Sequence, residues 1–146
     1  MNSQQSIQFV KKLFEEVYVK GNLNALNEAF DANVKLIDPA APNFKGGLNE
    51  LKERETMYKQ AFPDKKIKID NIFAGEDHVI VQWTCTGTHR GELQGIAPTN
   101  KHIKITGITL YHFSKNGKIS ECCQSWDRLG LLEQIGEIQP ALALHR

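Results

Sequence analysis

The second half of the chain constrains the fold most, because long segments of alternating apolar and polar residues follow one another there without a helix between them. In the segment 78–89, one phase carries Val79, Val81, Trp83 and Cys85. Successive side chains of a strand point to opposite faces, so alternation of this kind is typical of strands with one buried face. Asn116-Gly117 is a strong hairpin-turn signal. We therefore expect an antiparallel sheet built from segments 65–75, 78–89, 101–113 and 119–127.

The third of these segments predicts a bend. Ile103 and Ile105 begin the apolar phase, but Ile108 and Leu110 continue it one residue out of step, with Gly107 between the two pairs. A change of phase at a glycine is typical of a β-bulge or a sharp bend. Such a bend curls a sheet.

The first half of the chain is mainly helical. Apolar residues at helical spacing predict a helix over about 3–20, a short second helix that carries Leu23, Leu26 and Phe30, and a third over about 48–61. A strand, "NVKLID", lies between the last two. The expected fold class is α+β: a cone-shaped, strongly bent antiparallel sheet covered by three N-terminal helices, with a short C-terminal helix. A curled sheet closed by helices leaves a cavity suited to a small hydrophobic ligand.

Length and charge narrow the class of protein. The chain has 146 residues, as expected for a single domain spanning 1–146. Its 18 basic and 17 acidic residues favour neither nucleic acid nor an acidic membrane surface as partner. The N-terminus has no pattern of a secretory signal or a membrane span. Three cysteines, two of them adjacent at 122 and 123, predict no disulfide framework and favour a reducing cytoplasm.

Three motifs in the second half resemble a known family. They are G-x-L-x-G-I-x-P-T at 91–99, F-x-x-x-G-K-I-x-E at 113–121 and D-x-L-G-L-L-x-Q-I-G at 127–136. The sequence resembles the SnoaL-like polyketide cyclases, which belong to the nuclear transport factor 2-like superfold. This resemblance implies a cofactor-independent intramolecular aldol condensation on a polyketide-like carbonyl compound, and a homodimer. An acidic residue in the cone is the general acid/base of such cyclases, and it matches Asp127.

Asp127 has two interpretations. On one strand face with Ile119 and Cys123, it would be a carboxylate in apolar surroundings, whose raised pKa suits proton transfer at carbon. Alternatively, Asp127 is the N-cap of the helix that begins in "DRLGLL". The chain also departs from the family, since Cys122-Cys123 replaces the His-Trp pair that many members carry.

Asp38 is a second catalytic candidate. The stretch "LIDPAAPNFKGG" resembles the strand-end Asp-Pro of the ketosteroid isomerases, in which the matching aspartate is the general base. Those isomerases also need a tyrosine and a protonated aspartate as an oxyanion hole. The matching positions here are Phe14 and Thr109, which disfavours isomerase chemistry. Turn formation by Asp-Pro is the alternative role of Asp38.

Other side chains are candidates for contacts with the ligand; the alternative is core packing for the aromatic residues and an ordinary satisfied or solvated side chain for the histidines. The sequence contains no metal-binding motif, no nucleophile elbow and no phosphate-binding glycine loop, so we expect no metal and no cofactor. A non-catalytic ligand-binding domain or a dimerising module remains an alternative to an enzyme. The candidate ligand-binding residues are Phe14, Tyr18, Tyr58, Trp83, His89, His112 and Cys123.

Overall fold

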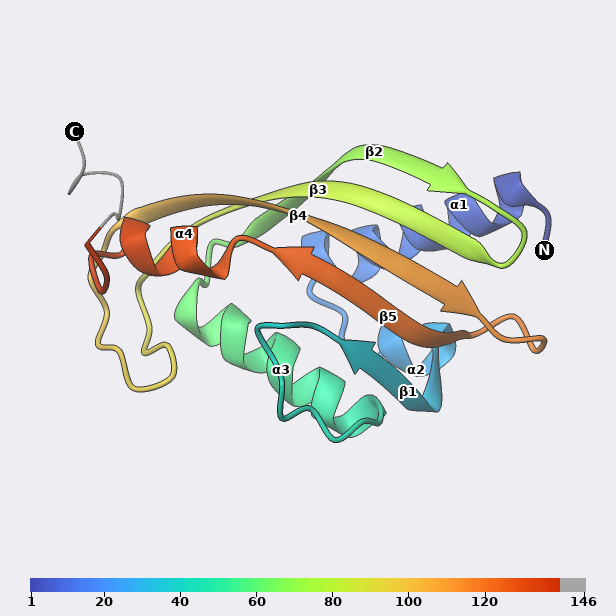
Figure 1. The fold of residues 1–146 in the computed structure, drawn as a ribbon, viewed down its shortest axis with the longest axis horizontal. Helices are drawn as coiled ribbons and strands as arrows, with labels where there is room; N and C mark the ends of the chain where they lie inside the picture. Colours follow the sequence, from blue (N-terminus) through green and yellow to red (C-terminus); the bar gives the residue numbers. More distant parts are fainter. Residues whose placement is uncertain (140–146) are drawn as a thin grey trace.

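A computed structural model describes residues 1–139, and its element order matches the α+β expectation (Figure 1). The N-terminal half supplies three α-helices, a π-helical turn and one strand, and the C-terminal half supplies four long strands and a short helix. The elements are α1 (Ser3–Phe14), the π-helix η1 (Glu15–Val19), α2 (Ala25–Ala29), β1 (Phe30–Ile37), α3 (Leu48–Ala61), β2 (Lys66–Ala74), β3 (His78–Thr88), β4 (His102–Phe113), β5 (Ile119–Trp126) and α4 (Arg128–Gln134).

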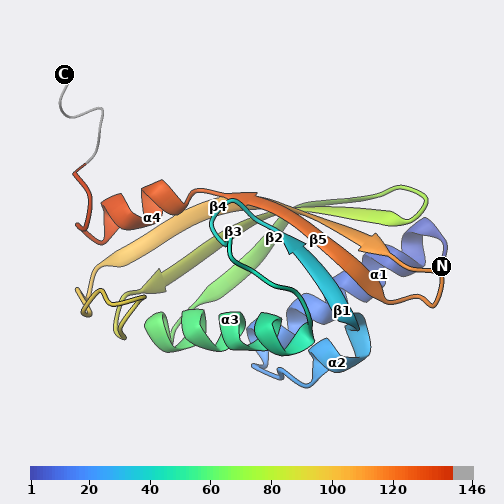
Figure 2. The same ribbon diagram turned by 60° about the horizontal axis from the view of Figure 1, so that its bottom comes forward.

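The five strands form one curved sheet in the order β1-β5-β4-β3-β2. Strands β2 to β5 pair in an antiparallel manner, as expected, whereas β1 runs parallel to β5. The sheet is therefore mixed. Helices α1, α2 and α3 lie on its concave side (Figure 2). We call this helix-covered side the inner face and the opposite side the outer face.

Strand β4 does not change phase at Gly107, and that expectation was wrong. Its pairing with β3 is continuous from His78↔His112 to Thr88↔His102, and buried positions alternate along its whole length. Ile108 is 50% exposed on the outer face. The sheet is instead irregular elsewhere, with one extra residue at Asp70 in β2 and another at Ser120 in β5.

Gly107 is required by a close approach. It is the cross-strand partner of Trp83, whose indole ring lies across it on the inner face. A Cβ atom added at Gly107 would lie 2.3 Å from Cζ2 of Trp83, far inside van der Waals contact. The glycine therefore makes room for the indole ring.

The outer face carries exposed apolar side chains from three adjacent strands. Phe73 is 62% exposed, Ile108 50% and Ile80 42%. Such side chains are typical of an interface; the homodimer stays a prediction. Within residues 1–139, no helix is long and apolar enough to cross a membrane.

Replacing Gly107 by alanine tests the close approach. We expect Gly107→Ala to lower the free energy of unfolding by about 1–3 kcal/mol, because the new methyl group displaces the Trp83 ring. Gly75→Ala is the matched control, since a Cβ there meets nothing within 4 Å. Urea unfolding of both variants measures the difference, and equal stability of the two would contradict the packing described.

Candidate active site

A cavity lies between the inner face and the helices η1 and α3. The space open to the centres of water-sized molecules is about 100 Å³, and the cavity is partly open to solvent. Its lining is mostly aromatic and aliphatic, with a few polar groups. The lining residues are Phe14, Tyr18, Arg54, Glu55, Tyr58, Phe62, Lys65, Ile67, Trp83, Cys85, Ile103, Ile105, Thr109, Tyr111, Gln124, Trp126 and Leu131.

Four of the predicted ligand-binding residues lie in this wall: Phe14, Tyr18, Tyr58 and Trp83. Tyr18 reaches it from the π-helical turn that follows α1. There the amide of Lys20 donates to the carbonyl of Glu15, five residues back. A π-turn widens the helix locally and is common at functional sites.

Asp127 does not line the cavity, and the expectation that it faces the cone was wrong. The residue is exposed, and its Oδ1 accepts a hydrogen bond of 2.8 Å from the amide of Gly130. This is the N-cap of α4. The bulge at Ser120 explains the difference, because one extra residue inverts the faces of all side chains beyond it. Trp126 consequently points inward and Asp127 outward.

The same inversion places Cys123 on the outer face, so it does not contact the cavity as expected. His112 also lies on the outer face, where it pairs with His78. His89 is fully buried but outside the cavity, beside the Phe62 ring and hydrogen-bonded through Nδ1 to Thr99. None of these three is a wall residue.

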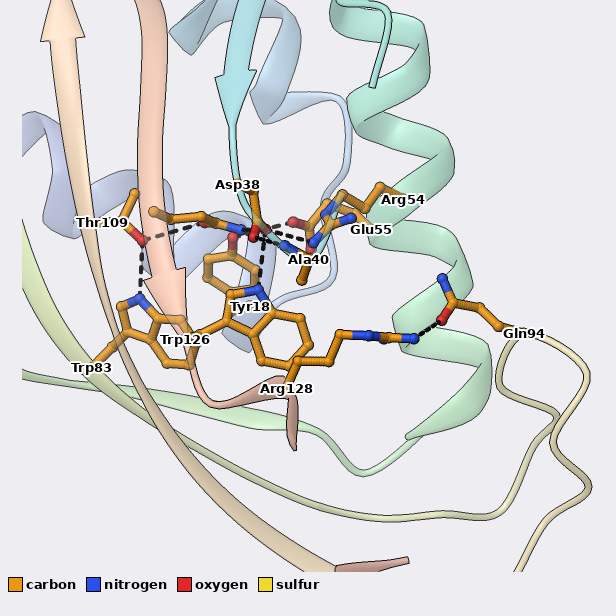
Figure 3. A network of polar contacts seen from close by, with 11 residues as sticks. Tyr18, Asp38, Ala40, Arg54, Glu55, Trp83, Gln94, Thr109, Trp126 and Arg128 are labelled. Atoms are coloured by element: carbon orange, nitrogen blue, oxygen red, sulfur yellow. Dashed lines mark hydrogen bonds and ion pairs between the residues drawn. The ribbon is translucent and has the colours of Figure 1, made fainter. Parts of the chain in front are cut away.

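Asp38 lies behind the cavity wall and anchors it (Figure 3). Its Oδ2 accepts hydrogen bonds from Arg54 Nη2 at 2.8 Å, Gln124 Nε2 at 2.8 Å and Trp126 Nε1 at 3.0 Å. Its Oδ1 accepts from the amide of Ala40 at 2.8 Å. The carboxylate is fully buried. The donors come from α3, β5 and the loop after β1, so one side chain joins three parts of the fold.

These contacts decide between the two roles of Asp38. Both oxygens are occupied, and the guanidinium of Arg54 balances the charge, so the carboxylate is held by protein donors. Two hydrogen bonds are the turn contacts that Asp-Pro predicts. The amide of Ala40 donates to the Asp38 side chain, and the amide of Ala41 donates to the Asp38 carbonyl. The geometry is that of a structural carboxylate.

Glu55 is the acid that lies in the cavity wall, and the sequence analysis missed it. Its Oε1 accepts a long hydrogen bond of 3.4 Å from the Tyr18 hydroxyl, and its Oε2 lies 3.6 Å from Nζ of Lys65. A signal was present in α3, where Leu51, Glu55, Tyr58 and Phe62 follow the i, i+4, i+7, i+11 spacing of one helix face. Glu55 interrupts that apolar face.

The hydroxyl groups of two tyrosines near Glu55, Tyr18 and Tyr58, can donate hydrogen bonds. The Tyr58 hydroxyl is buried and has no hydrogen-bond partner within residues 1–139. Burial raises the pKa of Tyr58, and burial followed by the charge of Glu55 raises that of Tyr18. Both hydroxyls therefore stay protonated at neutral pH. A buried donor with no protein partner is costly unless a ligand or an ordered water satisfies it.

Thr109 and Cys85 are not suited to two other reactions, isomerisation of the ketosteroid kind and nucleophilic attack by a thiol. Thr109 accepts from Trp83 Nε1 at 3.0 Å and donates to Gln124 Oε1 at 3.3 Å, so its hydroxyl is engaged by the protein. Together with Phe14, this leaves no oxyanion hole of the ketosteroid isomerase kind. Burial raises the pKa of the Cys85 thiol to about 11, which keeps it a protonated, poor nucleophile.

Solved structures share this fold over nearly the whole chain. A protein from Acidithiobacillus ferrooxidans assigned as a polyketide cyclase is 32% identical, with a TM-score of 0.76 over 88% of this chain and 92% of that one. A protein from a Jannaschia species assigned as a SnoaL-like polyketide cyclase is 21% identical, with a TM-score of 0.83 over 94% and 95%.

The fold alone is shared more widely than one activity. A Streptomyces galilaeus protein assigned as a hydroxylase is 19% identical, with a TM-score of 0.84 over 99% of this chain and 90% of its own. No curated protein matches the sequence. The family model described as SnoaL-like polyketide cyclase matches residues 8–135. By that match and by the 32% identity to its Acidithiobacillus relative, the chain belongs to the SnoaL-like polyketide cyclase family.

Proposed function

We propose that this protein is a cofactor-independent enzyme that binds a small hydrophobic carbonyl compound in the cavity and transfers protons with Glu55. The observation that carries the proposal is the buried hydroxyl of Tyr58, which has no partner among the described residues and lies one helical turn from Glu55 in the same wall. A carboxylate base beside a protonated donor is what enolisation of a ketone needs. The surrounding aromatic wall favours an apolar substrate.

The proposed reaction has two proton transfers. The Glu55 carboxylate takes a proton from the carbon next to the substrate carbonyl, and the Tyr58 hydroxyl donates a hydrogen bond to the enolate oxygen that forms. The enolate carbon then attacks a second carbonyl of the same molecule, which forms a carbon–carbon bond and closes a ring. The resulting alkoxide takes the proton back from Glu55, so the base is regenerated and no cofactor is consumed.

The neighbouring side chains support this assignment to Glu55. Lys65 at 3.6 Å compensates the carboxylate charge, and the Tyr18 hydroxyl lies 3.4 Å from it. Long, imperfect contacts of this kind leave the carboxylate available to a substrate. Asp38 lacks that freedom because protein donors occupy both of its oxygens.

The relatives and the chemistry of the wall support the proposed substrate class. Polyketide-like chains carry several carbonyl groups in one molecule, as an intramolecular aldol reaction requires. Solved relatives with this fold are assigned as polyketide cyclases. A non-catalytic ligand-binding domain is the alternative, and it makes a different prediction below.

Solvent deuterium exchange tests the catalytic carboxylate. We expect the wild-type protein to accelerate exchange at the central carbon of benzoylacetone, a small aromatic 1,3-diketone, as followed by NMR. Glu55→Gln should lower the catalysed rate by about 10²–10⁴-fold, because glutamine cannot accept the proton. Tyr58→Phe should lower it by about 10²-fold or more, since the enolate loses its donor.

The control for this experiment is Asp127→Asn, which changes the surface cap and leaves the cavity intact. Its rate should equal that of the wild type. A rate lost in Asp127→Asn and kept in Glu55→Gln would reverse the assignment. Saturable binding of the diketone with no acceleration of exchange would instead support the non-catalytic ligand-binding domain.

The two aspartates should differ in their effect on stability. We expect Asp38→Asn to lower the free energy of unfolding by about 3–5 kcal/mol, because the guanidinium of Arg54 stays buried without its counter-charge. Asp127→Asn should change it by less than about 0.5 kcal/mol, since asparagine caps a helix as well as aspartate does. Urea unfolding measures both, and equal effects would contradict the structural role of Asp38.

A further inference from the structure

We propose that the outer face of the sheet carries a site for a divalent transition metal ion, made by Asp77, His78 and His112. The sequence gives no sign of this site, because His112 lies 34 residues beyond His78. The fold brings them together as cross-strand partners at the end of β3 and β4, and Asp77 lies in the turn just before β3. The site is independent of the cavity, since both histidines point away from the inner face.

The side chains already converge. His78 Nε2 lies 3.0 Å from His112 Nδ1, and the two ring centroids are 4.5 Å apart. The Asp77 carboxylate spans both rings: its Oδ1 lies 2.6 Å from His78 Nδ1 and its Oδ2 lies 3.7 Å from His112 Nδ1. One ligand atom from each of the three residues lies within 4.8 Å of the others.

These separations suit a metal centre. Two ligands bound to Zn²⁺ at 2.0–2.1 Å in a tetrahedral arrangement are about 3.3 Å apart. The His78 Nε2–His112 Nδ1 distance of 3.0 Å and the Asp77 Oδ2–His112 Nδ1 distance of 3.7 Å lie on either side of that value, and side-chain rotation brings the third pair, within 4.8 Å, into the same range.

The backbone holds the three residues in place before any ion arrives. The amide of Phe113 donates to the Asp77 carbonyl at 2.8 Å, which ties the turn to the end of β4. The amide of Gly75 donates to the His78 carbonyl at 2.9 Å and closes the same turn. A ligand set fixed in this way loses less conformational entropy on binding.

The donors indicate the class of ion. Two imidazoles and one carboxylate prefer Zn²⁺, Ni²⁺ or Cu²⁺ to Mg²⁺ or Ca²⁺, which prefer oxygen ligands. The side chains of Asp77, His78 and His112 are 56%, 41% and 38% exposed, so an ion can reach them from solvent. Glu121 on β5 is the cross-strand partner of His112 and adds negative charge near the site. Lys35 on β1 is in turn the cross-strand partner of Glu121 and offsets part of that charge.

Calorimetric titration of the full chain tests the site, after treatment with EDTA and dialysis. The Cys123→Ser background removes the thiol on the outer face, so that cysteine cannot bind the added metal. We expect saturable binding of one Zn²⁺ per chain and no binding of Mg²⁺. His112→Gln and Asp77→Asn should each weaken Zn²⁺ binding by at least about 10–100-fold, the range known for the loss of an outer-shell partner, because each variant loses a direct ligand.

The matched control is His102→Gln, which removes an exposed histidine at the other end of β4 and should leave Zn²⁺ binding unchanged. Circular dichroism in EDTA checks that each variant is folded. If His112→Gln fails to fold, Asp77→Asn in the exposed turn decides the question. The absence of saturable Zn²⁺ binding, or equal affinity in wild type and in a folded variant, would overturn the proposal.

Discussion

The buried carboxylate of Asp38 is the interaction on which the site depends. It accepts hydrogen bonds from donors on α3, on β5 and in its own turn. Three of these donor side chains also line the cavity: Arg54, Gln124 and Trp126. A buried charge without its partner is strongly destabilising, so loss of either Asp38 or Arg54 would disrupt the contacts of the other. Asp38, one of the two acids that the sequence offers as catalysts, therefore shapes the cavity.

The two residues proposed to act on the substrate both lie on α3. Its inward face presents Glu55 and Tyr58 one turn apart, and the neighbouring π-helical turn η1 brings Tyr18 against Glu55. Trp83 can occupy the wall because Gly107 leaves space behind its ring. A carboxylate, two protonated hydroxyl groups and an apolar lining are thus supplied by packing features that each have a local cause.

The class of fold, the four consecutive strands and the aromatic wall residues could be predicted from periodicity, because side-chain alternation and helical spacing are local properties. The faces of β5 could not, since one extra residue at Ser120 inverts them and sends Cys123 and Asp127 outward. The parallel pairing of β1 with β5 joins distant segments and has no local signal. Glu55 was visible as a break in an apolar helix face, but only the fold shows that this face meets the cavity.

The most direct test of the proposed catalytic role of Glu55 is a crystal structure of the protein with benzoylacetone or a larger polyketide-like ketone bound. We expect a carbonyl oxygen within about 3 Å of the Tyr58 hydroxyl. We also expect the carbon next to that carbonyl to lie against the Glu55 carboxylate, with Asp38 still bound to Arg54. A ligand whose reactive carbon lies beside Asp127 or on the outer face, with the Tyr58 hydroxyl left unpaired, would contradict it.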